Sequence, residues 1–142
     1  MANYYATIRT NYFAVKDEDA FRALMDKVYG EDEIKIFEHP QEDGSVLFGF
    51  GCFGGISGLA GDEGDDDDGS ALDCFYDELQ KLIKDDDAII ITEIGSEKLR
   101  YLVAVSTVIT QTEICIIDLN TLSVRQAGEA LGNAKFVTQM HY

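Results

Sequence analysis

One glycine pattern in the chain has the spacing of a phosphate-binding motif. Gly49, Gly51 and Gly54 match G-x-G-x-x-G and follow a stretch of strand-forming residues. In dinucleotide-binding proteins such glycines lead into a helix whose N-terminus holds a pyrophosphate. No helical pattern begins at Gly54, and the charged residues that follow are acids, which repel phosphate. We therefore interpret the segment as a flexible exit from a strand and predict no bound nucleotide.

An acidic run offers the oxygen ligands that calcium and magnesium prefer. It consists of Asp62, Glu63, Asp65, Asp66, Asp67 and Asp68. When Gly69 is aligned with the glycine of a calcium-binding loop, Gly64 occupies the first ligand position and Phe75 the last, so the ligand pattern fails. We expect weak association of divalent cations at Asp62 to Asp68, no defined metal site and no other cofactor.

The chain has three cysteines and two histidines as candidates for nucleophilic or metal chemistry. Cys74 and Cys115 fall in apolar segments, which predicts small buried side chains. Cys52 lies beside glycines and is the candidate for an exposed thiol, but the negative surroundings disfavour a reactive thiolate. His39 and His141 have no ligand partner at zinc-binding spacing. We therefore predict no catalytic residues and a protein that is not an enzyme.

The charge balance is strongly acidic. The 142 residues include 27 acids and 11 bases, a formal net charge of −16. Such a field repels nucleic acids and anionic membranes, so we expect neither as a direct partner and expect instead a protein with a basic surface. Residues 1–92 hold 22 acids and seven bases, whereas residues 93–142 hold five acids and four bases. The candidate partner-binding residues are the acids of the run above together with Glu31, Asp32, Glu33, Asp85, Asp86 and Asp87.

The length and the hydrophobic content of 46% are typical of one domain over residues 1–142. Apolar runs and alternation predict strands over 4–15, 33–39, 45–53, 88–94, 99–109 and 113–119, and helical spacing predicts helices over 17–30, 70–84 and 121–131. Residues 54–69 are rich in glycine and aspartate, which predicts a mobile acidic loop. The order of elements predicts an α+β fold, in which a single, mainly antiparallel, twisted sheet of about six strands carries two to three helices on one face.

Local signals predict the ends of several elements. Asp17 is a candidate N-terminal cap of the first helix, and Gly30 is its candidate end. Gly132 is expected to end the third helix. The continuous apolar run over 88–94 is typical of a central strand.

The first strand is unusual because aromatic and polar residues are mixed along it. The residues concerned are Tyr4, Tyr5, Arg9, Asn11, Tyr12 and Phe13. One interpretation is simple alternation, with one side packed in the core and Arg9 paired with a carboxylate. The other is an exposed patch of aromatic residues and arginine, a composition enriched at interface hot spots. The tendency of strand aromatics to pack favours the first.

The chain lacks the signals of export or membrane insertion. No basic and apolar leader is present, and no apolar stretch approaches the roughly 20 residues that a spanning helix needs. The odd number of cysteines without a CxxC pair indicates reduced thiols. We therefore expect a cytoplasmic protein.

Two segments, ANYYATIRTNYFAVKD near the start and GSEKLRYLVAV later in the chain, carry a resemblance. They resemble small acidic proteins carried by phages and conjugative elements of low-GC Gram-positive bacteria. The group has no settled activity, so the resemblance implies a mobile-element origin and a cytoplasmic setting, without assigning a role to any residue.

Two functional hypotheses follow from these observations, beside a third, an enzyme whose pocket is built from residues too scattered to recognise. The first is an accessory protein that imitates the phosphate charge of a nucleic acid and inhibits a host defence protein that binds DNA or RNA. The second is a protein-interaction or regulatory module in which the acids serve solubility, with two copies pairing through an exposed sheet edge in the nearly neutral C-terminal portion. Salt dependence separates the two, because only a charge mimic loses its partner steeply as salt rises.

Overall fold

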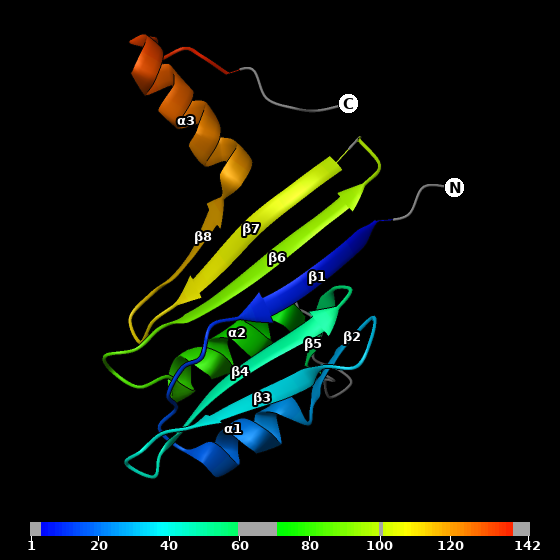
Figure 1. The fold of residues 1–142 in the computed structure, drawn as a ribbon, viewed down its shortest axis with the longest axis vertical. Helices are drawn as coiled ribbons and strands as arrows, with labels where there is room; N and C mark the ends of the chain where they lie inside the picture. The colour runs from blue at the N-terminus through cyan, green and yellow to red at the C-terminus, as the bar shows by residue number, and fades with distance from the viewer. Residues whose placement is uncertain (1–3, 60–70, 100, 138–142) are drawn as a thin grey trace.

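The computed structural model describes residues 4–59, 71–99 and 101–137, and these form an α+β fold around one antiparallel sheet (Figure 1). The sheet contains six strands in the order β3-β4-β1-β6-β7-β8. Their bounds are β1 Tyr5–Thr10, β3 Lys35–Pro40, β4 Val46–Phe53, β6 Ile89–Glu97, β7 Tyr101–Ile109 and β8 Ile114–Asp118. A second, two-stranded sheet joins β2 (Val28–Gly30) to β5 (Ile56–Leu59). The predicted fold class is confirmed, as is the central position of β6.

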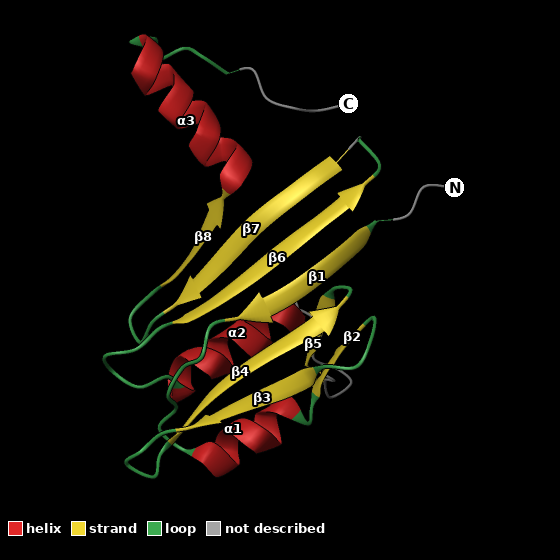
Figure 2. Ribbon diagram, viewed as in Figure 1, coloured by secondary structure: helices red, strands yellow, loops and turns green. Residues whose placement is uncertain are grey.

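Of the three helices in the described residues, two cover one face of the large sheet (Figure 2). Helix α1 (Glu18–Met25) buries Phe21, Leu24 and Met25, and helix α2 (Ala71–Leu82) buries Phe75 and Leu79. Helix α3 (Leu119–Leu131) follows β8 directly and extends beyond the strand ends, away from α1 and α2 (Figure 1). The helical coverage is therefore concentrated over the N-terminal strands and β6.

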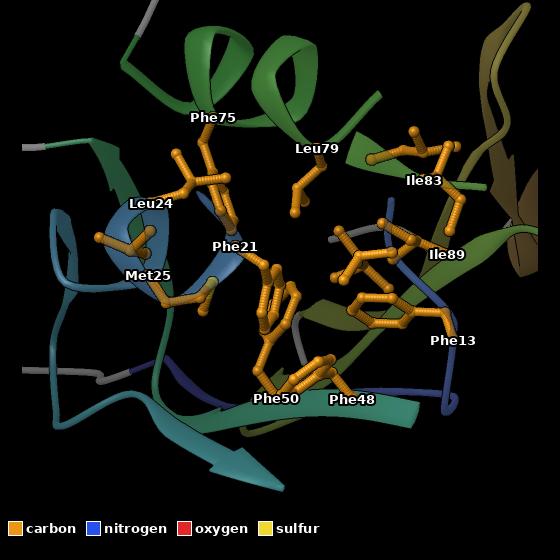
Figure 3. Close-up of a cluster of buried hydrophobic side chains, with 14 of the residues drawn as sticks. Phe13, Phe21, Leu24, Met25, Phe48, Phe50, Phe75, Leu79, Ile83 and Ile89 are labelled. Carbon is orange, nitrogen blue, oxygen red and sulfur yellow. The ribbon is translucent and has the colours of Figure 1, made fainter. Parts of the chain in front are cut away.

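The core lies between these two helices and the sheet (Figure 3). Phe21 of α1 contacts Phe48 of β4 with ring centroids 4.8 Å apart, and Phe75 of α2 contacts Phe50 at 5.7 Å. Phe13 joins the group with its ring edge toward Phe21, 5.7 Å away. All five rings are fully buried. Alternate residues of β4 thus supply the sheet side of an aromatic core.

The first helix is shorter than its apolar spacing predicts. Asp17 caps it as expected, because the backbone N–H of Ala20 donates to the Asp17 carboxylate at 3.1 Å. The prediction that the helix ends at Gly30 is wrong, since it ends at Met25 and Val28–Gly30 forms β2. Gly30 is needed for a close approach to β5, where a Cβ would collide with the carbonyl oxygen of Gly55.

The first strand also ends earlier than predicted, at Thr10. The backbone N–H of Asn11 still donates to the carbonyl of Ile90 at 3.3 Å. Its side chain supplies the remaining bonds to this segment, since the amide donates to the carbonyl of Ala88 at 3.1 Å and accepts from the N–H of Ile90 at 2.8 Å. Phe13 can then form a single bridge with Phe48 and enter the core.

The predicted loop over 54–69 is corrected at its start, because Ile56–Leu59 forms β5. Gly58, with φ of 127°, lets this strand pass against the first turn of α2, where a Cβ would collide with the backbone of Ala71. The acids from Asp62 to Asp68 lie outside the described residues. The predicted stop of the third helix is confirmed, since Gly132 closes α3 in a left-handed conformation at φ of 66°.

Candidate interaction surface

The face of the large sheet opposite α1 and α2 is not covered by either helix, and we call it the open face. Residues paired across antiparallel strands point to the same face, so the strand register defines its members. They are Lys35, Phe37 and His39 of β3, Leu47, Gly49, Gly51 and Phe53 of β4, Tyr5, Thr7 and Arg9 of β1, Ile90, Thr92, Ile94 and Ser96 of β6, Leu102, Ala104, Ser106 and Val108 of β7, and Cys115 and Ile117 of β8. None of these side chains is a carboxylate.

The acidic residues of the strands alternate with the open-face residues, so their side chains lie on the other face of the sheet. Glu93 and Glu97 of β6 alternate with the open-face residues, and Glu38 of β3 points toward α1, where Arg22 donates to it at 2.6 Å. That ion pair raises the pKa of Arg22 and lowers the pKa of Glu38, the hydrogen bond between them being the main cause. In a chain with a net charge of −16, the two faces of one sheet therefore differ sharply in composition.

Four residues of the open face and its edge form a cluster of cation and aromatic rings, which we call the Arg9 cluster: Arg9, Tyr12, Phe37 and His39. The Arg9 guanidinium lies 4.2 Å from the centroid of the Phe37 ring and 5.6 Å from that of Tyr12. The Tyr12 and His39 rings meet edge to face at 5.3 Å. Arg9 also donates to the Tyr12 hydroxyl at 3.4 Å. These contacts orient the guanidinium without neutralising it.

Two glycines of β4 make room for this cluster. Gly51 lies between Arg9 on one neighbouring strand and Lys35 on the other. A Cβ at Gly51 would lie 3.4 Å from Arg9 Cδ and 3.5 Å from Phe37 Cε2, and 2.8 Å from the carbonyl oxygen of Ile8. Gly49 has the same role under Tyr12, with its Cβ position 3.5 Å from Tyr12 Cδ1.

The G-x-G-x-x-G pattern thus has a structural explanation that the sequence analysis missed. Gly49 and Gly51 lie inside β4, so the interpretation as a flexible strand exit is wrong for them. Phe48, Phe50 and Cys52 alternate with them and are buried. Only Gly54, with φ of 104°, marks the turn out of the strand.

Exposed apolar side chains lie on the open face to one side of the cluster, toward the start of β1. The exposed fractions are 71% for Tyr5, 63% for Phe53, 55% for Ile94 and 45% for Leu102. The favoured interpretation of this strand, alternation with one side packed in the core, is confirmed, because Ile8 and Phe13 are buried while Tyr5 and Arg9 are exposed. The expected carboxylate partner of Arg9 is wrong in its detail, since the guanidinium lies against the rings of Phe37 and Tyr12. The signal that could have found this surface is alternation: along each strand of the sheet, the acids and the buried hydrophobic side chains never occupy the positions of the open face.

The candidate acids before β3 partly serve the local backbone. Glu31 accepts a hydrogen bond from the N–H of Gly55 at 3.1 Å, and Asp32 accepts from the N–H of Glu33 at 2.7 Å. The carboxylate of Glu33 lies 4.0 Å from the ammonium of Lys35. All three acids are exposed, so they contribute to the negative field while fixing the entry into β3.

The candidate acids before β6 also include one that bonds the local backbone and others that face solvent. Asp87 is partly buried and accepts from the N–H groups of Ala14 at 2.7 Å and Ala88 at 2.8 Å. Asp85 lies 3.6 Å from Lys16, and both Asp85 and Asp86 are exposed. Asp87 therefore has a structural role, and the other two face solvent.

The two described acidic groups do not form one surface. Strand β3 runs antiparallel to β4, β4 to β1, and β1 to β6, so β3 and β6 run in opposite directions. Residues 31–33 and 85–87, which precede these strands, consequently lie at opposite ends of the sheet. The acids from Asp62 to Asp68 cannot be placed relative to either group, since they lie outside the described residues.

The expected burial or exposure is wrong for all three cysteines. Cys52 is buried and its thiol donates to the carbonyl of Asp32 at 3.5 Å, because β4 turns this side chain toward the helices. Cys74 and Cys115 are exposed. Cys74 lines a shallow pocket of about 430 Å³ between α1, β5 and α2, together with Leu24, Lys27, Leu59, Asp77, Glu78 and Lys81. This pocket lies on the helical side, away from the Arg9 cluster.

One tyrosine has a strongly shifted pKa. Burial and a hydrogen bond from its hydroxyl to Glu93, at 2.8 Å, raise the pKa of Tyr4 to about 12. Gly95 accommodates the ring, since a Cβ there would collide with the Tyr4 hydroxyl. The pair stabilises the contact between β1 and β6 near the start of the domain and has no nucleophile beside it in the described residues.

Within residues 4–59, 71–99 and 101–137, no three His, Cys, Asp or Glu side chains gather closely enough to hold a metal ion. In that same part of the chain, no helix has the length and apolar character needed to cross a membrane. Comparison of the chain with protein-family models, curated protein sequences and solved structures found no match.

Proposed function

We propose that the protein is a non-enzymatic interaction module that binds a partner protein through the Arg9 cluster and the open face around it. The observation that carries the proposal is the absence of carboxylates from the open-face positions of a chain with 27 acids. A face that served only solubility would be expected to carry acids as the rest of the surface does.

The composition of the cluster suits a protein partner. Exposed arginine and aromatic side chains are enriched at interface hot spots, where few residues supply most of the binding free energy. The stacked Arg9 guanidinium is held in place, so little side-chain entropy is lost on binding. With Lys35 and His39 on the same face, the expected partner surface is apolar and offers a carboxylate to Arg9.

Mimicry of a nucleic acid is the second candidate function. Its support is the exposure of Glu31, Asp32, Glu33, Asp85 and Asp86, together with the resemblance to mobile-element proteins. A duplex carries about one charge per 1.7 Å of axis, so a mimic needs acids in a continuous row. The separation of residues 31–33 from 85–87 weighs against this candidate.

Affinity capture with matched variants tests both candidates. The bait is the full chain, incubated with lysate of a low-GC Gram-positive bacterium, the host class that the resemblance suggests. The first variant, R9A with F37A, removes the stacked pair. The control, K27A with Y29A, removes an exposed lysine and an exposed tyrosine outside the open face. Truncating two hot-spot residues should weaken capture of a specific partner by about 30-fold or more, equivalent to about 2 kcal/mol.

A third variant, E33Q with D85N and D86N, removes exposed acids and keeps the carboxylates that accept hydrogen bonds from the backbone. We expect it to capture the same partner as the wild type, with little change as salt rises. If the acid variant loses the partner, capture falls steeply with salt and R9A with F37A retains it, the module proposal is wrong and mimicry is supported.

A further inference from the structure

The C-terminal part of the domain leaves apolar side chains uncovered. Beyond Ile109, the single buried residue within 110–137 is Gly128. Ile116 of β8 and Leu131 of α3 are each 66% exposed, and Leu119 and Leu122 at the start of α3 are exposed as well. Leu119 and Leu122 lie within one turn of each other at the start of α3, directly after β8, whereas Leu131 lies about two and a half turns beyond Leu122 and on the opposite side of the helix.

Strand β8 is also an edge strand. It pairs with β7 on one side, and no other strand of the described residues pairs with its second side. Edges of this kind are ordinarily protected by lysine, proline, a bulge or a covering element. The sequence of β8, ICIID, contains neither lysine nor proline, and its pairing with β7 is regular.

The hairpin geometry shows which backbone groups face outward. The N–H of Thr110 donates to the carbonyl of Glu113 at 2.9 Å, so Glu113 belongs to a hydrogen-bonded pair with β7. Such pairs alternate along an antiparallel ladder. Cys115 and Ile117 therefore direct their N–H and carbonyl groups to β7, while those of Ile114 and Ile116 point to the outer edge.

Charge argues that the occupant of this edge is a second copy of the chain. Two molecules with a net charge of −16 repel each other wherever their acids face. Residues 114–137 contain two acids, Asp118 and Glu129, and two bases, Arg125 and Lys135. The edge and α3 are thus a neutral region through which two copies can approach. An antiparallel strand edge is also self-complementary about a two-fold axis, as an isologous interface requires.

We propose that two copies pair antiparallel through β8, joining their sheets and covering exposed side chains of β8 and of the start of α3. In the expected register Ile114 pairs with Ile116 of the second copy, which uses the outward N–H and carbonyl groups of both residues. The two-fold axis then passes between the two Cys115 residues. An axis through Ile116 would instead pair Ile114 with Asp118. That register is disfavoured because the Asp118 carboxylate caps α3, where it accepts from the N–H of Asn120 at 2.9 Å.

This arrangement goes beyond the proposed function and uses a different edge of the molecule. The Arg9 cluster lies on β1 and β3, toward the opposite side of the sheet from β8. Antiparallel pairing of two edges about an axis perpendicular to the sheet keeps the two open faces on the same side. A dimer would therefore present two Arg9 clusters on one continuous face, which would strengthen binding to a multivalent partner.

The mass in solution is the first test. At about 100 µM and under reducing conditions, sedimentation equilibrium of the wild type should give twice the chain mass of 15.7 kDa. I116K places a charge on a side chain that is exposed in the single chain, so it should give the single mass with an unchanged circular dichroism spectrum. The matched control is I36K on the opposite edge strand, β3, where Ile36 is also exposed; it should remain dimeric. A wild type with the single mass, or a dimeric I116K, would overturn the proposal.

Oxidation by diamide tests the register, using C74S so that Cys115 is the exposed thiol of the described residues. Opposed Cys115 residues in a non-hydrogen-bonded pair have Cα atoms about 4.5 Å apart, which lies within the range of disulfides. The two thiols should form one disulfide as diamide takes up their two hydrogen atoms, giving a covalent dimer that C74S with C115S does not give. A dimer by sedimentation without this cross-link would refute pairing about Cys115.

Discussion

The domain divides into two regions with opposite properties: a body, residues 4–59 and 71–109 as far as they are described, and an arm, residues 110–137. The body contains every fully buried large side chain, including Phe13, Phe50 and Ile109. The arm buries one glycine. The body also belongs to the part of the chain that carries most of the net charge. The comparison teaches that the body holds the core. The arm is positioned by β7, adds the partly buried Ile114 to that core and leaves most of its other apolar residues exposed.

The largest difference should appear when one apolar side chain is truncated in each region. F50A removes a fully buried ring that packs on Phe75 and Phe13, and should lower the free energy of unfolding by about 3–5 kcal/mol. L131A removes an exposed side chain of the arm and should change it by less than about 0.5 kcal/mol. Urea denaturation measures both, at a concentration where the protein is monomeric. Equal losses in the free energy of unfolding for F50A and L131A would contradict the distinction between body and arm.

A smaller effect is expected from filling the space under the Arg9 cluster. In G51A the new Cβ would lie 2.8 Å from the carbonyl oxygen of Ile8, so the backbone must shift, at a cost of about 1–3 kcal/mol. G55A is the matched control, because its Cβ meets nothing within 4 Å. Thermal unfolding compares the two variants. If G51A were as stable as G55A, the close approach of β1 and β4 at this glycine would be wrong.

The acids of the body should not be equivalent. D87A leaves the N–H groups of Ala14 and Ala88 without their carboxylate partner and should cost about 1–2 kcal/mol. D86A, on an exposed neighbour, should be neutral within about 0.5 kcal/mol. Denaturant titration distinguishes them. A destabilised D86A beside an unaffected D87A would contradict the division of the acidic group into structural and solvent-facing members.

The smallest effect concerns alkaline pH. The pKa of Tyr4 is raised from 10.0 to about 12, so the folded state holds the phenolic proton more tightly than the unfolded chain does. The stabilisation is complete below pH 10 and is lost as the pH rises toward 12. Y4F should flatten this part of the stability profile, with Y29F retaining the wild-type slope. Identical slopes in the wild type and Y4F would exclude the contact with Glu93 as a source of stability.

The sequence predicts the body better than the surfaces. Apolar periodicity places most strands and helices within a few residues, because the same residues that set the period are those that pack. Its errors arise where a contact distant in sequence decides the outcome. The helix ends at Met25 because β2 must meet β5, and β1 ends at Thr10 because the Asn11 side chain supplies the remaining bonds there.

The interaction surface is harder to predict because it depends on register. Nothing local to Arg9 shows that Phe37 will lie beside it, since the two residues meet across Gly51 of an intervening strand. The predictions for the cysteines fail for the same reason, because the buried or exposed state of Cys52 and Cys115 depends on which side of the sheet the helices cover. The acidic groups are visible in the sequence, but the direction of each strand decides that residues 31–33 and 85–87 are far apart.

The most direct test of the contrast between body and arm is amide hydrogen exchange measured residue by residue at two protein concentrations, about 20 µM and about 500 µM. The account predicts that the amides of β6 exchange at the same rate at both concentrations. The amides of Ile114 and Ile116, whose N–H groups point away from β7, should be more strongly protected at the higher concentration. Protection of these two amides that does not change with concentration, or their rapid exchange at both, would contradict it.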